Sequence, residues 1–102
     1  MKYIAGLVLL MLLATMPAIA IQATMKDGAF GCKNIGDCEQ LVSDMNNPNY
    51  FRNNLDMFIS EGKAITFDAG ERVELTDTES GDYTEVSYNG ENYWVYNDYI
   101  VR

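Results

Sequence analysis

The stretch EVSYNGENYWVYNDYI (residues 85–100) decides the fold, because two runs of strand-forming residues flank Asn89-Gly90. Asn-Gly is the dipeptide that most favours a two-residue type I′ hairpin turn. Such a short loop fixes the register, so we expect three facing pairs: Tyr88 with Glu91, Val86 with Tyr93, and Thr84 with Val95. Side chains alternate along a strand, which gives the hairpin two different faces. One face carries Val86, Tyr93 and Val95, and the other carries Glu85, Trp94 and Tyr96.

Residues 1–20 have the features of a secretory signal peptide. Lys2 supplies a positive charge, residues 3–16 are almost wholly apolar, and Ala18-Ile19-Ala20 matches an A-x-A cleavage site. A retained membrane anchor is the alternative, but the apolar run is shorter than the roughly 20 residues of a spanning helix. Ile21, in place of Cys, argues against a lipid-modified N-terminus. We predict cleavage after Ala20 and a periplasmic or secreted protein.

The mature chain, residues 21–102, is long enough for one small domain with a thin core. Loss of Lys2 leaves 15 acidic and 6 basic residues, a net charge of −9. This charge disfavours nucleic acids and anionic lipid surfaces as partners, because both would repel the protein. It fits a cationic protein partner, and it is also explained by solubility alone. We expect no stable membrane insertion after cleavage.

Cys32 and Cys38 are the two cysteines of the chain. In an exported protein, such a pair favours a disulfide over a metal site or a free thiol. Gly36 lies between them, where a tight bend would bring the two side chains together. The spacing is not a recognised redox motif, and a zinc site would need carboxylates because the chain has no His. We predict a structural disulfide, no metal and no cofactor.

Two amphipathic helices are predicted over about residues 37–62. Asp37 and Gln40 form an approximate capping box for the first helix, and its apolar face consists of Cys38, Leu41, Val42 and Met45. Asn47 is the expected N-cap of the second helix, with Pro48 in its first turn. The apolar positions of that helix are Phe51, Leu55, Phe58 and Ile59, and Gly62 is its C-cap glycine.

The apolar period changes from 3.6 to 2 at Ala64, which indicates strands. We expect strands over residues 64–67 and 72–76, a first strand over 21–25, a polar loop over 78–82 and a bend at Asn97-Asp98. Val73 and Leu75 should point inward. The predicted fold class is therefore α+β, in a single domain over residues 21–102.

Phe67 to Val101 resembles a bacterial SH3-like domain. The matching elements are Gly70, Val73-Glu74-Leu75, Asp77 to Asp82, Val86 to Gly90, Trp94-Val95 and Tyr99-Ile100. Tyr93 stands where the family usually has Gly before Trp, a departure that would alter the groove beside Trp94. The resemblance implies a small SH3-like β-barrel over about residues 64–102, preceded by one or two short helices. The mature layout also looks like small exported bacterial proteins of unassigned function.

SH3-like domains bind peptides, often cell-wall peptides, or act as targeting and scaffold modules. The resemblance therefore implies a binding module that recognises a peptide or protein of the cell envelope through an aromatic groove. The candidate binding residues are Trp94, Tyr96, Tyr99 and Tyr83. Flat amphipathic rings bind extended peptides at low entropic cost, but a thin core also takes its volume from aromatic residues. For Trp94 and Tyr96 both interpretations are open.

A second hypothesis is an acidic inhibitor or immunity-type protein that blocks a basic envelope hydrolase, and a third is a structural role in an envelope assembly. Catalysis is not expected, because no His is present to activate Ser or Cys and no G-x-S-x-G motif occurs. Asp77 to Asp82 does not match a calcium-binding EF-hand loop, which needs Gly at position six and Glu at twelve.

Overall fold

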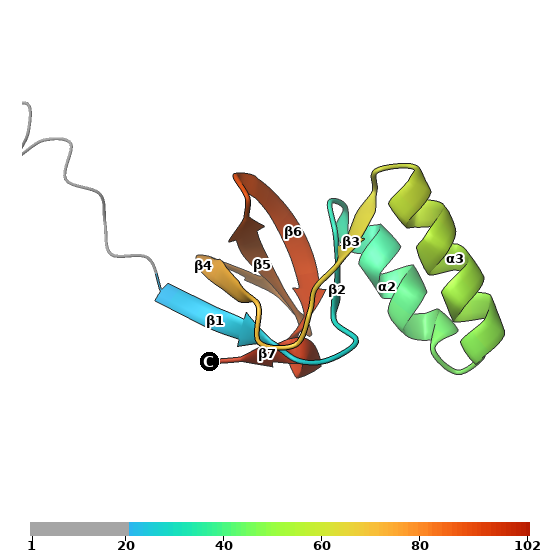
Figure 1. Ribbon diagram of the computed structural model, residues 1–102, viewed down its shortest axis with the longest axis horizontal. Coiled ribbons are helices and arrows are strands. Elements are labelled where there is room, and N and C mark those ends of the chain that lie inside the picture. The colour runs from blue at the N-terminus through green and yellow to red at the C-terminus, as the bar shows by residue number, and fades with distance from the viewer. Residues whose placement is uncertain (1–20) are drawn as a thin grey trace, which may run out of the picture.

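The computed structural model describes residues 21–102 and has an α+β architecture (Figure 1). Seven strands form one antiparallel sheet, and two helices lie together beside it. The elements are β1 (Ile21–Met25), β2 (Phe30–Cys32), α2 (Ile35–Asp44), α3 (Pro48–Ser60), β3 (Ala64–Thr66), β4 (Arg72–Ser80), β5 (Tyr83–Tyr88), β6 (Glu91–Tyr96), the 3₁₀ turn η1 (Asn97–Tyr99) and β7 (Ile100–Val101). The predicted signal peptide lies outside the described residues. Within residues 21–102, neither helix has the length and apolar character needed to cross a membrane.

The β5–β6 hairpin has the predicted turn and register. Asn89 and Gly90 have φ angles of 52° and 81°, both in the left-handed region that a type I′ turn requires. The three expected facing pairs all occur. Val86, Tyr93 and Val95 are buried together on one face, as the alternation predicted. Local sequence therefore determines this part of the fold.

The strand order is β3-β2-β6-β5-β4-β1-β7, and the sheet is open. The predicted first strand, β1, pairs with β4 on one side and with β7 on the other. This arrangement brings the two ends of the described chain together at the side of the sheet away from the helices (Figure 1). One hydrophobic core belongs to this part of the sheet and contains Ala23, Met25, Ala29, Phe67, Val73, Val86, Tyr93, Val95 and Ile100.

The helices do not simply precede the sheet, as expected, but are inserted between two of its strands. β2 and β3 pair with each other, and β2 also pairs with β6, so the chain leaves the sheet at Cys32 and returns at Ala64. The sequence did not indicate β2, because three residues, Phe30-Gly31-Cys32, are too few to show a period. Its strand conformation depends on pairing with β3 and β6, which lie far along the chain.

The ends of the two helices differ in how well they were predicted. α2 begins two residues before the predicted start, because Asn34 is its N-cap and accepts a hydrogen bond from the Gly36 N–H at 3.0 Å. Asp37 therefore lies in the first turn and is not the cap. α3 begins as predicted, with the Asn47 side chain accepting from the Tyr50 N–H at 3.3 Å.

α3 also ends as predicted. Gly62 has φ 74°, and the Lys63 N–H donates to the Phe58 carbonyl at 2.8 Å. This is the bonding pattern of a Schellman motif, which a glycine in the left-handed region permits. The chain then turns directly into β3.

A second hydrophobic core joins the helices to the sheet. Its buried members are Phe30, Cys32, Cys38, Leu41, Phe58 and Ala64. Trp94, Tyr83 and Tyr99 pack against it from the sheet side. The sheet is therefore covered by apolar side chains on both faces where β6 passes the helices.

β4 is longer than predicted. It continues through the expected polar loop to Ser80, so that only Gly81-Asp82 remain as a turn. The register with β5 shifts between Leu75 and Glu79, and Asp77 takes a φ of 68° there. A β-bulge of this kind lets a strand continue while it bends and re-aims side chains. The polar residues predicted a loop because a bulge does not have the alternating pattern of a regular strand.

Candidate functional site

Three of the four predicted binding residues form a continuous row of rings, here called the tyrosine strip: Tyr83, Tyr96 and Tyr99. The Tyr83 and Tyr96 ring centroids are 5.6 Å apart, and those of Tyr96 and Tyr99 are 6.2 Å apart. Each ring is half-buried. The rings are tilted or edge-to-face, which is the favourable arrangement for aromatic pairs. β5, β6 and η1 thus present three phenol rings at one surface.

Trp94, the fourth predicted residue, is held where β6 meets α2. Its indole is half-buried and packs against the second core. The Trp94 main-chain carbonyl accepts a hydrogen bond from the Cys38 thiol at 3.5 Å, and Trp94 lies opposite Cys32 in the β2–β6 pair. The structure therefore brings Trp94 close to the tyrosine strip but gives it packing contacts with the helices of its own chain.

The charged groups that act on the tyrosine strip are acidic. Burial, followed by Cys38, Glu39, Tyr96 and Asp82, raises the pKa of Tyr83 to about 12. Burial, followed by Cys38, Asp98 and Tyr96, raises the pKa of Tyr99. These hydroxyls therefore stay protonated at neutral pH and lie in a negative potential. Glu39 comes from α2, and no sequence pattern indicated that it would approach residues of the hairpin.

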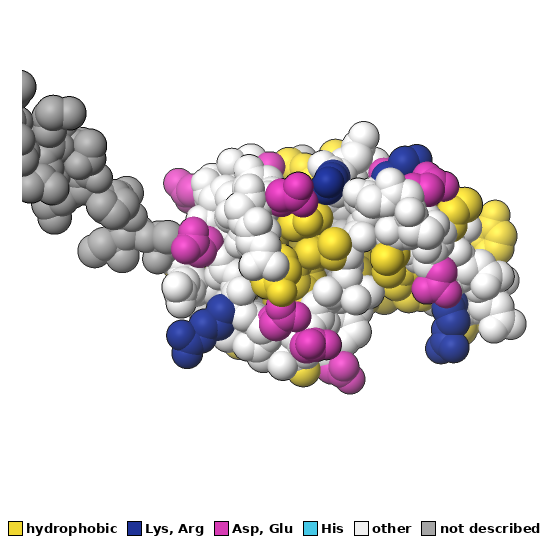
Figure 2. All heavy atoms as spheres, turned by 45° about the horizontal axis from the view of Figure 1, so that its top comes forward, with side chains coloured by type: hydrophobic (Ala, Val, Ile, Leu, Met, Phe, Trp, Pro, Cys, Tyr) yellow, Lys and Arg dark blue, Asp and Glu magenta, His cyan; other side chains and the backbone are white. Residues whose placement is uncertain are grey.

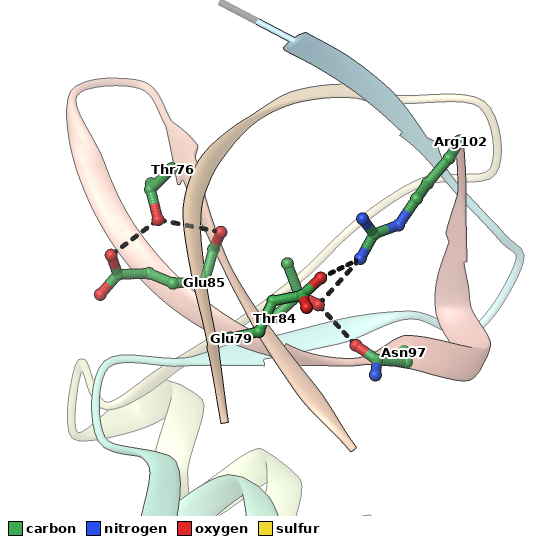
Figure 3. Close-up of polar contacts among 6 residues, drawn as sticks. All are labelled: Thr76, Glu79, Thr84, Glu85, Asn97 and Arg102. Carbon is green, nitrogen blue, oxygen red and sulfur yellow. Dashed lines mark hydrogen bonds and ion pairs between the residues drawn. The ribbon is translucent and has the colours of Figure 1, made fainter. Parts of the chain in front are cut away.

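A network of polar side chains ties the C-terminal residue to the sheet (Figure 3). Thr84 is almost completely buried, and its hydroxyl donates to Asn97 Oδ1 at 2.5 Å. Arg102 Nη2 donates both to Thr84 Oγ1 at 3.2 Å and to Glu79 Oε1 at 2.8 Å. The buried hydroxyl is thus satisfied as both donor and acceptor. This network was not predicted, because Thr84 looked like an ordinary strand residue opposite Val95.

A cavity of about 180 Å³ adjoins this network. It is lined by Ile21, Gln22, Leu75, Asp77, Glu79, Thr84 and Arg102. Two more open hollows of about 360 Å³ and 220 Å³ lie along β1 and β4. None of the three is lined by Trp94 or by the tyrosine strip, so the predicted aromatic residues form a surface row and do not line these cavities.

The two cysteines are fully buried, one in β2 and one in α2, and the structure has them as free thiols. A hydrogen bond with Cys38, together with burial, raises the pKa of the Cys32 thiol. The side chains therefore face each other as the sequence predicted, and the disulfide between them stays a prediction. Within residues 21–102, no three potential metal-ligating side chains gather in one place.

Figure 2 shows one face of the molecule, on which hydrophobic side chains gather between the sheet and the helices and acidic side chains border them.

Comparison of the chain with protein-family models, curated proteins and solved structures finds no match. The case for a function therefore depends on the residues and their geometry.

Proposed function

We propose that this protein is an exported binding module that recognises an extended, positively charged segment of an envelope peptide or protein. The tyrosine strip is the proposed binding surface, and the observation that carries the proposal is its combination of half-buried, partly exposed aromatic rings with acidic neighbours. We assign no catalytic step to it. A cell-wall peptide that carries a free amino group is one ligand of this class.

The proposed fold is an SH3-like arrangement with a helical insertion. Three features support it: a first strand next to both β4 and the last strand, a tight Asn-Gly hairpin, and a 3₁₀ turn just before the last strand. In this proposal, the α2–α3 pair occupies the excursion between the first strand and β4. The tyrosine strip then lies beside the 3₁₀ turn, where Tyr99 is contributed by η1 itself.

Aromatic faces and carboxylates together favour ammonium and guanidinium groups. A cation over the face of a tyrosine ring is attracted by the ring quadrupole, by about 0.5–1 kcal/mol at an exposed site. Glu39 and Asp82 contribute to the raised pKa of Tyr83, and Asp98 contributes to the raised pKa of Tyr99, so these carboxylates make the potential at the strip negative. Complementary charge of this kind contributes specificity and fast association.

A binding experiment tests this proposal. The affinity for a short capped peptide of alternating alanine and lysine is measured by protein fluorescence and by NMR. Tyr96→Ala should weaken binding at least several-fold, whereas Tyr50→Ala should not, because Tyr50 is an exposed tyrosine on α3, outside the strip. A matched peptide with glutamine in place of lysine should bind poorly to the parent protein. Equal binding of both peptides, or equal affinity of the two variants, would contradict the proposal.

The acidic neighbours give a second, independent comparison. Glu39→Gln combined with Asp98→Asn should reduce affinity for the lysine peptide and flatten its dependence on salt. Asp56→Asn, an exposed acid on α3, removes a similar charge elsewhere and is the control. If all acidic substitutions weaken binding equally, the attraction comes from net charge and not from the strip.

The alternative function is an inhibitor or immunity-type protein that blocks a basic envelope hydrolase. Exposed apolar side chains on α3 favour it, since Tyr50 and Met57 are 59% and 45% exposed and lie one heptad apart on the helix. In that case Met57→Ala should weaken inhibition while Tyr96→Ala has no effect. The two candidate functions therefore use different surfaces of the same chain.

Export is part of the proposal and is tested by mass spectrometry of the protein recovered from periplasm and medium. An N-terminus at Ile21 supports it. An intact N-terminus at Met1 in the membrane fraction would contradict it and favour the anchor instead.

A further inference from the structure

We propose that the cavity between β1, β4 and Arg102 is a second binding site, separate from the tyrosine strip, and that it takes a small zwitterion of the α-amino acid type. The cavity has a volume of about 180 Å³ and is lined by residues of the first strand, the bulged strand, β5 and the chain end. Sites for drug-sized ligands are typically about 300–1,000 Å³. The ligand is therefore smaller than these.

The bulge in β4 creates the cavity. The described pairing of β1 with β4 extends from Thr24↔Arg72 to Ile21↔Leu75. Beyond Leu75, β4 shifts its register with β5, and Asp77 adopts a φ of 68°. A non-glycine residue in this region is uncommon and costs free energy, and such residues are concentrated at functional sites. Here the distortion brings Asp77 to the cavity lined by Ile21 and Leu75.

Opposite charges line the cavity without fully neutralising each other. Arg102 Nη2 contacts Glu79 and Thr84 (Figure 3). Within residues 21–102, the Asp77 carboxylate has no hydrogen-bond or ion-pair partner, and the other guanidinium nitrogens of Arg102 have none either. The site thus offers one carboxylate as acceptor and several N–H groups as donors, above a buried Thr84 hydroxyl that is already satisfied.

An α-amino acid with a small aliphatic side chain complements each of these features. Its ammonium group would donate to Asp77, its carboxylate would accept from Arg102, and its side chain would contact Ile21 and Leu75. A lone cation would leave the guanidinium unused, and a simple anion would be repelled by Asp77 and Glu79. A neutral apolar molecule would cover charged groups without pairing them, which is unfavourable.

The test is an NMR titration of the ¹⁵N-labelled protein, as purified from expressing cells, with L-valine. Saturable shifts should appear at the amides of Gln22, Leu75 and Thr84, which line the cavity. N-acetylvaline lacks the ammonium group and valinamide lacks the carboxylate. Each should therefore bind at least about tenfold more weakly than valine, because hydrogen bonds to charged groups are the stronger ones. Absence of saturable shifts, or equal affinity for the three compounds, would overturn the proposal.

Matched variants locate the two charges. Asp77→Asn keeps the shape and tolerates positive φ, so it should fold while binding valine about tenfold more weakly, with little further loss for N-acetylvaline. Arg102→Gln should show the reverse selectivity, with little further loss for valinamide. Asp56→Asn and Arg52→Gln, both exposed on α3, are the controls and should bind as the parent does.

Stability of the variants is checked by thermal unfolding. If Asp77→Asn does not fold, Asp77→Gly removes the carboxylate and relieves the positive φ, and the same loss of valine affinity is expected. Binding that is unchanged in either variant would overturn the assignment. The lysine peptide should bind the Asp77 and Arg102 variants as it binds the parent, so failure of this site and failure of the tyrosine strip are distinguishable.

Discussion

The thiol of Cys38, in α2, donates a hydrogen bond to the main-chain carbonyl of Trp94, in β6, over 3.5 Å. This contact links two residues that are far apart in the sequence, and it lies in the second core, where the helices meet the sheet. Because the indole of Trp94 packs against the same core, the residue that looked most like a ligand platform is partly a packing residue. Tyr83 and Tyr99 pack against this core as well, so we place the proposed binding surface on the parts of the tyrosine strip that remain exposed.

Trp94→Ala should therefore destabilise the protein. Full truncation of a buried tryptophan costs about 3–5 kcal/mol, and for this half-buried indole we expect about 2–4 kcal/mol by urea unfolding. Trp94→Phe should lose less, since it keeps a ring against the helices. The parent emission should be blue-shifted from that of indole in water. A water-like, easily quenched emission with unchanged stability in Trp94→Ala would show that the side chain is a surface platform instead.

Gly90→Val should destabilise the hairpin by about 1–3 kcal/mol. Gly90 has φ 81°, and a Cβ added there would meet no other atom within 4 Å. The penalty is therefore conformational and not a clash, since a β-branched residue resists this backbone region. Asn92→Val, at an exposed position of the same hairpin, is the control and should keep the parent stability. Superimposable denaturation curves for Gly90→Val and the parent would contradict the role assigned to the turn.

Cys32 and Cys38 should be linked in protein recovered from an oxidising compartment. Both thiols are buried in the second core, and Cys38 raises the pKa of the Cys32 thiol, as expected for two side chains that lie close together. Peptide mapping without reductant should find one intramolecular cross-link, and reduction should lower stability by about 2 kcal/mol, because the closed loop is short. Two alkylatable thiols in the freshly isolated, unfolded protein would contradict the disulfide.

Acidification should weaken the contact between Glu71 and Tyr88. The Tyr88 hydroxyl donates to the Glu71 carboxylate, and this bond, followed by the Asp68 N–H, holds the pKa of Glu71 below its usual range. A lowered folded-state pKa contributes stability above the unfolded-state value, about 4.3 for glutamate. That contribution is lost as the pH falls through the lower folded-state pKa.

Tyr88→Phe removes the hydrogen bond and should therefore reduce this part of the acid dependence. The measurement is urea unfolding of parent and variant between neutral pH and pH 3. Tyr50→Phe, in which the exposed α3 tyrosine loses its hydroxyl, is the control. Tyr88→Phe should be less stable than the parent at neutral pH and should approach the parent curve at the acid end, whereas Tyr50→Phe should follow the parent throughout. A constant difference between Tyr88→Phe and the parent across the whole range would contradict the linkage.

The parts of the fold that could be predicted are those that short stretches of sequence determine. Asn89-Gly90 specifies its own turn, and Asn47-Pro48 with Gly62 specifies both ends of α3. The predicted start of α2 was wrong because Asn34 and Asp37 are both good N-cap residues. β2 ends at Cys32, and the helix begins directly after it with Asn34 as the N-cap. Strand alternation put Trp94 and Tyr96 on one face of the hairpin, whereas Tyr99 joins the tyrosine strip from the 3₁₀ turn η1.

The remaining features depend on pairing between distant segments. The bulge at Asp77 belongs to the pairing of β4 with β5, and the cavity beside it is lined by β1 because β1 pairs with β4. Glu39 raises the pKa of Tyr83 only because the helical insertion packs α2 against the sheet. Neither arrangement has a periodic signal in the sequence, since each residue involved would be an ordinary surface acid if considered alone.

The insertion of the helices between β2 and β3 also has a kinetic consequence. The β5–β6 hairpin closes through a two-residue turn, and the α2–α3 pair is likewise local, so both can form early in folding. β1, by contrast, must find β4 across the whole helical segment, and loop closure over that length carries an entropic cost before any contact stabilises it. In the exported protein that we propose, β1 is the first strand to emerge and among the last to be incorporated. The edge of β4 stays open to other chains until β1 pairs with it.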